Sequence, residues 1–245
     1  MSAPSVSMEY ETKQASYRAL VTDRKRCRLC AKHLENASRI DGGELDSNEI
    51  GPYTRWQGNL DSPLVVVAQD FSDVAGFRKY CGWAGHDVAT NRHLVEFVRE
   101  AGFVIAPPKL GEPDNVLFFT NAVLCMKAGG RRGSQQPIPR RCFANCSAFL
   151  RRTITIVAPR VVVTLGGGAL YAIQLAFGLS ERGRLPDLVG RHLQLTNTIY
   201  LVPMYHPSPT VVNTHRPLNE MRADWRGLRP LFEAADNLPH TSAAA

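Results

Sequence analysis

Cysteine, acidic side chains and long apolar runs are all scarce in this 245-residue chain. Six cysteines are too few for disulfides to hold together a chain of this length, which excludes a secreted disulfide scaffold. No apolar run approaches the roughly 18 residues that a membrane-spanning helix needs. Residues 1–16 are polar and contain no apolar signal segment. We therefore expect a cytoplasmic protein with reduced thiols, no membrane association and a monomeric state.

Acidic residues are outnumbered: 22 Asp and Glu face 29 Lys and Arg, which gives a formal net charge of +7. This balance is compatible with a polyanionic partner such as nucleic acid. Residues 127–141 carry basic side chains and no acid; the basic residues are Lys127, Arg131, Arg132, Arg140 and Arg141. Glycines and prolines mark this segment as a loop. It is either a solvated basic loop or a loop that contacts phosphates.

Apolar, β-branched runs recur along the chain and predict buried strands at 64–68, 116–120, 160–165 and 199–204. Helical patterns lie at 91–102, 140–157, 167–179 and 218–235. This alternation predicts an α/β fold, a single-domain α/β/α sandwich with a central, mostly parallel four-stranded sheet. We expect the domain to span 13–235, with disordered ends at 1–12 and 236–245.

Polar side chains follow three of these runs. Asp70 comes after the first run, Asn121 after the second, and His206 after the last, in His206-Pro207-Ser208-Pro209. Because open α/β sheets bind ligands at the carboxyl edge of their strands, we expect these side chains to share a pocket. A carboxylate and an imidazole there can activate water and stabilise a developing anion. The Asn121 amide suits the N–H and C=O edge of a pyrimidine.

Each of these residues also has an ordinary structural interpretation. The His-Pro pair can be a turn, Asp70 can cap a helix, and Asn121 can form a turn. Three such residues at three strand ends favour chemistry over coincidence.

A glycine-rich turn, Gly166-Gly167-Gly168, follows the third run and opens a helix. It does not complete the dinucleotide-binding pattern G-x-G-x-x-G, because Tyr171 occupies the last glycine position. We expect the turn to let the backbone approach a phosphate or a neighbouring strand.

Tyr80 precedes the glycine-containing segment 81–85 and is the candidate for stacking on a base. It can equally be a core aromatic, and Phe71, Phe77 and Trp83 are rivals for the stacking role.

The cysteines are unevenly spaced. Cys27 and Cys30 form a C-x-x-C pair, Cys125 ends the segment after Asn121, and Cys146 lies in the following helix one turn after Cys142. Four thiolates brought together could hold a structural zinc or an iron–sulfur cluster. Alone, the C-x-x-C pair could be a redox site.

The order of these motifs resembles that of the uracil-DNA glycosylase superfamily, especially its iron–sulfur branch (families 4 and 5), from about residue 27 to residue 231. The matching segments are Cys27-x-x-Cys30, Tyr80-Cys81-Gly82-Trp83-Ala84-Gly85, Thr120-Asn121-Ala122-Val123-Leu124-Cys125, Asn145-Cys146-Ser147-Ala148-Phe149-Leu150, 161–170 and His206-Pro207-Ser208. The resemblance implies a structural 4Fe–4S cluster held by Cys27, Cys30, Cys125 and Cys146, and no organic cofactor. It favours Cys146 over Cys142 as the fourth ligand.

The resemblance also implies hydrolysis of the N-glycosidic bond of uracil in DNA after base flipping, leaving an abasic site. Asp70 would orient the attacking water, and a neutral His206 would donate to the departing base. Tyr80 would stack on the base, Asn121 would read its edge, and Gln69 and Phe71 would line the pocket.

Contacts to the DNA would come from the later segments of the chain. The resemblance implies phosphate contacts from Gly166, Gly168, Ser208 and Arg216, and a wedge from Val211 (or its neighbour Val212) into the space the base leaves.

The first motif departs from the branch. The iron–sulfur families usually have Gly-Glu/Leu-Ala-Pro-Gly, whereas this chain has Ala68-Gln69-Asp70-Phe71, whose Gln-Asp pair is more similar to the Gly-Gln-Asp-Pro-Tyr motif of family 1. Two other functions stay open: a non-catalytic binder of uracil-containing or abasic DNA on the same fold, and a small-molecule N-ribosyl hydrolase or other α/β hydrolase.

Overall fold

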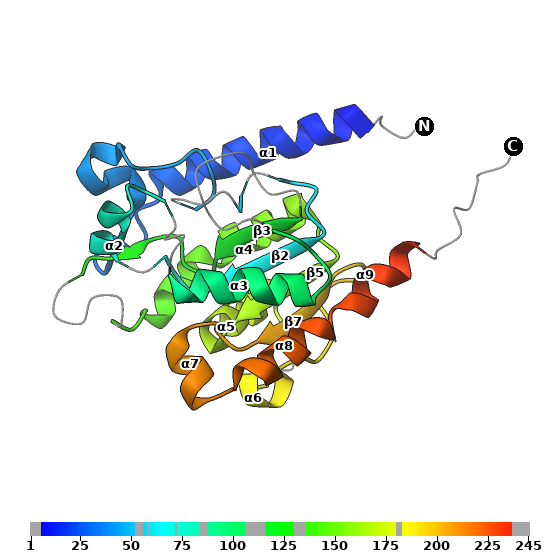
Figure 1. Cartoon of the computed structure of the whole chain (residues 1–245). Coiled ribbons are helices and arrows are strands. Elements are labelled where there is room, and N and C mark those ends of the chain that lie inside the picture. The colour runs from blue at the N-terminus through cyan, green and yellow to red at the C-terminus, as the bar shows by residue number, and fades with distance from the viewer. Residues whose placement is uncertain are drawn as a thin grey trace, which may run out of the picture.

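The structure is a computed structural model that describes residues 6–51, 56–57, 59–71, 73–83, 88–105, 116–129, 136–179 and 183–236. A five-stranded sheet with the order β3-β2-β5-β7-β6 forms its centre (Figure 1). The strands are β2 (Leu64–Ala68), β3 (Leu117–Asn121), β5 (Val161–Leu165), β6 (Leu193–Gln194) and β7 (Tyr200–Met204). The strands β3, β2, β5 and β7 are parallel, and β6 pairs antiparallel with β7 at the edge.

The predicted α/β class and the four parallel strands are confirmed, each strand within one residue of its expected bounds. The predicted strand number is wrong, because β6 adds a fifth strand. β6 has only two residues, Leu193 and Gln194, and neither is fully buried. So short a strand carries no apolar run that a sequence pattern could reveal.

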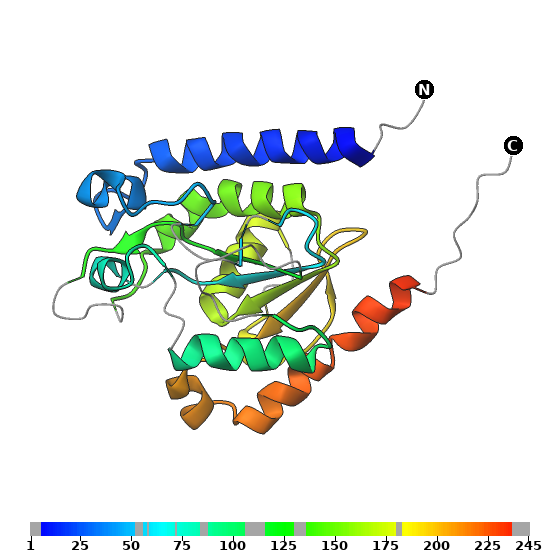
Figure 2. The same cartoon turned by 45° about the horizontal axis from the view of Figure 1, so that its top comes forward.

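Helices cover both faces of the sheet (Figures 1 and 2). Val65 and Val67 of β2 share one core with α1 (Val6–Arg26), α4 (Arg140–Val157) and α5 (Gly167–Phe177). Leu64 and Val66 of the same strand face the other core, with α3 (Ala89–Glu100) and α8 (Leu218–Arg226). Since alternate residues of a strand point to opposite faces, this division makes the fold an α/β/α sandwich.

Helix α4 occupies the expected residues 140–157. Its buried residues recur every three or four positions, among them Cys142, Cys146, Leu150 and Ile154. Ala158 ends it in the left-handed conformation (φ 50°), one residue before a proline. The same periodicity correctly placed α3 and α5.

The expected helix at 218–235 is two helices, α8 and α9 (Arg229–Asp236). Pro230 has no N–H, and its ring would clash with the carbonyl of Arg226, four residues earlier. Arg226 is the residue at which α8 ends. Asp236 completes α9, and the rest of the predicted disordered tail lies outside the described residues.

Residues 6–12, expected to be disordered, belong to α1. This helix is held by residues further along it: Tyr17, Leu20 and Val21 are buried, and Lys13 forms an ion pair of 2.7 Å with Asp61. The sequence pattern missed this part of the helix, because its polar first turns carry no apolar periodicity of their own.

A second, two-stranded sheet joins β1 (Leu34–Glu35) and β4 (Met126–Lys127) in antiparallel pairing. Shorter elements are η1 (Ala37–Gly43), α2 (Val74–Lys79), α6 (Leu185–Leu188) and α7 (Pro209–Thr214). Within the described ranges, no helix is both long and apolar enough to cross a membrane.

Candidate active site and cysteine cluster

The carboxyl ends of the four parallel strands carry the residues expected at the site. Asn121 is the last residue of β3 and lies opposite Ala68, the last residue of β2. The Gly166 N–H, after β5, donates to the carbonyl of Met204 at the end of β7 over 2.8 Å. A Cβ atom at Gly166 would lie 3.6 Å from that of His206. The expected shared edge is therefore present.

Asp70 is held from two sides. The Gln69 Nε2 atom donates to Asp70 Oδ1 over 3.0 Å, and Lys127 Nζ lies 2.9 Å from Asp70 Oδ2 in an ion pair. Only 6% of the Lys127 side chain and 8% of the Asp70 side chain are exposed. The expectation that Lys127 belongs to a basic surface loop is wrong, because β4 carries this residue into the site. Arg131 and Arg132 of that loop lie outside the described residues.

Gly168 makes room for Gln69. A Cβ atom at Gly168 would lie 2.1 Å from Gln69 Oε1, closer than atoms can approach. The absence of a side chain thus lets Gln69 pack against the start of α5 while it donates to Asp70. This close approach of a neighbouring strand is one of the two roles expected for the glycine turn.

His206 has its Nδ1 atom occupied. The Ser208 N–H donates to it over 3.2 Å. Burial lowers the pKa of His206 below its ordinary value of 6.5, although the nearby Asp70 acts in the opposite direction. The imidazole is therefore neutral at pH 7, and its proton is on Nε2, because Nδ1 is an acceptor.

His93 supports the same loop and was missed by the sequence reasoning. It lies on α3, and its Nδ1 lies 2.8 Å from the carbonyl oxygen of Pro207, to which it donates. Its ring stacks on Phe97 with centroids 6.1 Å apart. A polar residue on an amphipathic helix gives no sign in the sequence that it reaches a loop more than a hundred residues away.

Asn121 is 2% exposed, and its Oδ1 atom has no hydrogen-bond partner among the described residues. Buried amide oxygens are almost always paired, and an unpaired one costs free energy. An arriving ligand with an N–H group would satisfy it.

The two aromatic candidates differ in placement. Tyr80 is half-buried directly after α2, with Lys79 Nζ 5.1 Å from its ring centroid. Phe71 is buried in the core, and a Cβ atom at Gly51 would lie 2.4 Å from its Cζ. Phe71 is therefore a core residue packed against Gly51. Ala84 and Gly85 of the glycine-containing segment lie outside the described residues.

The loop after β7 leads into α7. Ser208 caps this helix, with its hydroxyl accepting from the Val211 N–H over 3.5 Å. Arg216 is engaged within the protein: it pairs with Asp224 over 2.5 Å and with Glu220 over 3.0 Å. Its charge is thus already balanced by two carboxylates, which argues against the expected phosphate contact.

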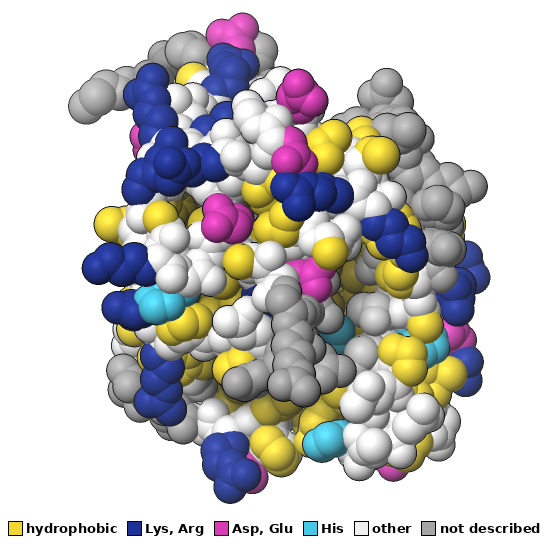
Figure 3. Space-filling model, turned by 90° about the vertical axis from the view of Figure 1, so that its left-hand side faces the viewer, with side chains coloured by type: hydrophobic (Ala, Val, Ile, Leu, Met, Phe, Trp, Pro, Cys, Tyr) yellow, Lys and Arg dark blue, Asp and Glu magenta, His cyan; other side chains and the backbone are white. Residues whose placement is uncertain are grey.

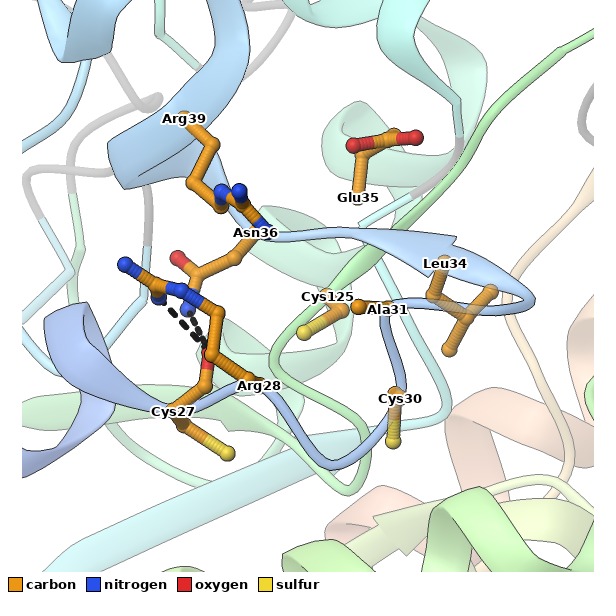
Figure 4. A pocket seen from close by; sticks show the side chains of 9 residues that line it. All are labelled: Cys27, Arg28, Cys30, Ala31, Leu34, Glu35, Asn36, Arg39 and Cys125. Atoms are coloured by element: carbon orange, nitrogen blue, oxygen red, sulfur yellow. Dashed lines mark hydrogen bonds between the residues drawn. The ribbon is translucent and has the colours of Figure 1, made fainter.

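Cysteines from three segments lie close together, and those of two segments line one cavity. Cys27, Cys30 and Cys125 line it, between the segment after α1 and the segment before β4 (Figure 4). The thiols of Cys146 and Cys142, both on α4, reach Cys30. The Asn145 amide donates to Cys30 Sγ over 3.4 Å. The two expected cysteine pairs are thus side by side, with Cys142 as a fifth neighbour.

The thiols influence one another's ionisation. Hydrogen bonds, first from Cys146 and then from Asn145 and Cys142, lower the pKa of Cys30 to about 6 although burial opposes them. Burial raises the pKa of Cys125 to about 12, and that of Cys142 likewise to about 12. The donated hydrogen bond to Cys30 and burial raise the pKa of Cys146. One thiolate is therefore surrounded by thiols that keep their protons.

This donor set has the chemistry of a soft-metal site, because a cation would let the remaining thiols ionise. As the side chains stand in the described ranges, no group of three or more Cys, His, Asp or Glu could hold a metal ion. The residues therefore fit an iron–sulfur cluster by donor type rather than by a formed coordination shell.

Figure 3 shows the left-hand side of the molecule as drawn in Figure 1. This face carries α2 and α7, the helices that follow β2 and β7 in the chain. Lys and Arg side chains gather along its upper and left-hand parts. The face that carries the strand ends is therefore bordered by positive charge, which suits a polyanion.

The sandwich and the polar residues at its strand ends define an α/β protein with a candidate site at the carboxyl edge of its sheet. Residues 57–229 match the model of the uracil DNA glycosylase superfamily, and the chain belongs to that superfamily. It lies close to the type 4 and type 5 branch.

Curated proteins similar to the chain include two uracil-DNA glycosylases. One is a type-5 uracil-DNA glycosylase of Pyrobaculum aerophilum, 28% identical over 171 residues that cover 67% of this chain and 69% of the relative. Another is a type-4 uracil-DNA glycosylase of Thermotoga maritima, 27% identical over 207 residues that cover 83% of this chain and 86% of the relative.

Proposed function

We propose that this protein is a DNA-repair glycosylase that hydrolyses the N-glycosidic bond of uracil in DNA and leaves an abasic site. The observation that carries the proposal is the unpaired Oδ1 atom of Asn121 at the edge shared by Asp70 and His206. Uracil has an N–H at N3 that this oxygen can accept, whereas cytosine has a lone pair there. This acceptor supports recognition of uracil over cytosine.

Base release needs the target nucleotide outside the helix, at a cost of a few kcal/mol. Tyr80 stacks on the extruded base, and Gln69 and the backbone above Phe71 form the pocket wall. Gly168, through its backbone N–H in the first turn of α5, and Ser208, through its hydroxyl, contact the flanking phosphates, whereas the N–H of Gly166 is already bonded to Met204. Val211 on α7 fills the space that the base leaves.

The chemical step separates charge. As the bond from the base nitrogen to C1′ breaks, its electron pair moves onto the base, and the sugar becomes cationic. The Nε2–H of neutral His206 donates to the developing base oxyanion, and the Asp70 carboxylate stabilises the sugar cation. Asp70 also orients the water whose oxygen adds to C1′, and the water proton leaves to solvent.

Cys27, Cys30, Cys125 and Cys146 hold a structural 4Fe–4S cluster in this proposal. Through a bound cluster these cysteines would tie together the segment after α1, the segment before β4 and helix α4, and the cluster would supply no redox step. The soft thiolate donor set and the low pKa of Cys30 support this assignment. No organic cofactor is required.

The test uses oligonucleotides that each carry one deaminated base, uracil, hypoxanthine or xanthine, in single and double strands. After incubation with the protein, alkali cleaves wherever an abasic site has formed. We expect cleavage at uracil. Tight binding without cleavage at any base would mean a non-catalytic binder, and release from free nucleosides with no salt-dependent oligonucleotide binding would mean a nucleoside hydrolase.

A further inference from the structure

Lys127 forms a buried ion pair with Asp70 that the proposed mechanism does not use. We propose that Lys127 is a positioning residue of base release, whose ammonium group fixes the Asp70 carboxylate in the orientation that holds the attacking water. This inference rests on the proposed glycosylase function and deepens it.

The burial of this pair argues for a task beyond stability. The Lys127 and Asp70 side chains are 6% and 8% exposed, and Nζ and Oδ2 are 2.9 Å apart. Taking two charges out of water is costly, and buried ion pairs can often be replaced by apolar residues without loss of stability. A lysine with a long, flexible stem placed here at that cost is more readily explained by the carboxylate that it holds.

The carboxylate has a hydrogen bond at Oδ1 and an ion pair at Oδ2, and Oδ2 makes no hydrogen bond among the described residues. Gln69 occupies one lone pair of Oδ1 at 3.0 Å, and Lys127 approaches Oδ2. Each oxygen has a second lone pair, so the carboxylate can still accept from a water. Two fixed partners leave the group little rotational freedom, which is what the precise placement of a nucleophilic water needs.

The backbone of Lys127 is itself held on two sides. Lys127 pairs with Leu34 across the β1–β4 sheet and forms an isolated bridge with Asp73. Leu34 follows the Cys27-x-x-Cys30 segment, and Asp73 caps α2, which leads to Tyr80. Cys125 stands two residues before Lys127. The Lys127 backbone is thus paired with the segment that follows Cys30 and with the cap of α2, and its side chain reaches Asp70.

The experiment compares single-turnover uracil release and oligonucleotide affinity for the wild type, Lys127→Met and Lys127→Arg. Lys127→Met keeps the stem and removes the charge. We expect its rate constant to fall about 100-fold, the cost of misplacing a reacting group by about 1 Å, with DNA affinity little changed. Lys127→Arg should restore part of the rate. Lys13→Met, which breaks the exposed pair with Asp61, is the matched control and should release uracil at the wild-type rate.

Together with the wild type and Lys127→Met, Asp70→Asn and the double variant Asp70→Asn/Lys127→Met form a double-mutant cycle. If Lys127 acts through Asp70, the lysine change costs no further rate in the Asp70→Asn background. The double variant removes both charges, so it tests the inference even if Lys127→Met alone does not fold.

Several outcomes would overturn the inference. A wild-type rate in folded Lys127→Met would do so, as would a loss that is fully additive with Asp70→Asn. A borohydride-trapped covalent complex with abasic DNA that needs Lys127 would make it a nucleophile instead. If the wild type releases no base at all, the proposed function fails first and this inference falls with it.

Discussion

The backbone N–H of Ser208 donates to Nδ1 of His206 over 3.2 Å, which fixes the neutral imidazole with its proton on Nε2. The two residues belong to one His-Pro-Ser turn, and His93 holds the proline carbonyl between them. A donor aimed by the fold before the substrate arrives need not reorganise when charge develops on the base.

Replacing His206 should slow base release and alter the pH dependence of stability. We expect His206→Gln to lose about 100- to 1,000-fold in single-turnover rate, the cost of one preorganised donor. The folded pKa of His206 lies below its unfolded value, so the unfolded state binds more protons and stability falls as the pH drops below about 6.5. Urea unfolding of His206→Gln should show a smaller fall over that range. His192 is exposed, so His192→Gln is the control. Its stability should depend on pH in the same way as that of the wild type.

Removing the Asn121 amide should abolish recognition and not the fold. Asn121→Ala should lower uracil release about 100-fold or more, because the N3–H of the base then has no acceptor in the pocket. Thr164→Val is the comparison, since Thr164 of β5 also buries an oxygen with no partner among the described residues. That variant should keep full activity. Equal losses in both variants would mean that Asn121 matters only for packing.

Gly168→Ala separates two roles of the glycine turn. The added Cβ would meet Gln69 Oε1 at 2.1 Å, whereas a Cβ at the adjacent Gly167 meets nothing within 4 Å. We expect Gly168→Ala to slow base release by displacing Gln69 from Asp70, while Gly167→Ala behaves like the wild type. Rate and DNA affinity are measured separately. A loss of affinity at an unchanged rate would show that Gly168 serves phosphate binding alone.

The cysteine variants test the cluster and its fourth ligand. Cys30→Ala and Cys146→Ala should abolish the brown colour and the absorbance at about 400 nm that are expected for thiolate-bound iron. Solubility or DNA binding should suffer before the chemistry does. Cys142→Ala should keep the absorbance. Cys81→Ala should keep it too, because Cys81 is exposed and is not among the residues that line the cavity. A Cys30→Ala protein that is folded, metal-free and fully active would contradict the structural role.

The strand ends were predictable because continuous apolar runs reveal buried parallel strands, and parallel strands put their carboxyl ends at one edge. Asp70, Asn121 and His206 follow from that rule alone. The pairing of Lys127 with Asp70 does not, because a lysine among glycines and arginines is typical of a surface loop. It became visible only with the β1–β4 pairing, which joins residues far apart in the chain.

Some contacts between neighbouring segments were also not predicted from the sequence. The resemblance implied a phosphate contact for Arg216, yet Asp224 and Glu220 on the next helix pair with it. The break between α8 and α9 could have been predicted from Pro230, whereas the helix at residues 6–12 could not, since its stability comes from contacts made further along α1.

Single-turnover release of uracil from a labelled oligonucleotide, by the wild type and by Asp70→Asn, tests the central claim most directly. We predict that the wild type frees the base and leaves an alkali-labile site. Asp70→Asn should bind the same DNA and release uracil at least about 100-fold more slowly. Tight binding by the wild type with no release, or equal release by both proteins, would contradict the account.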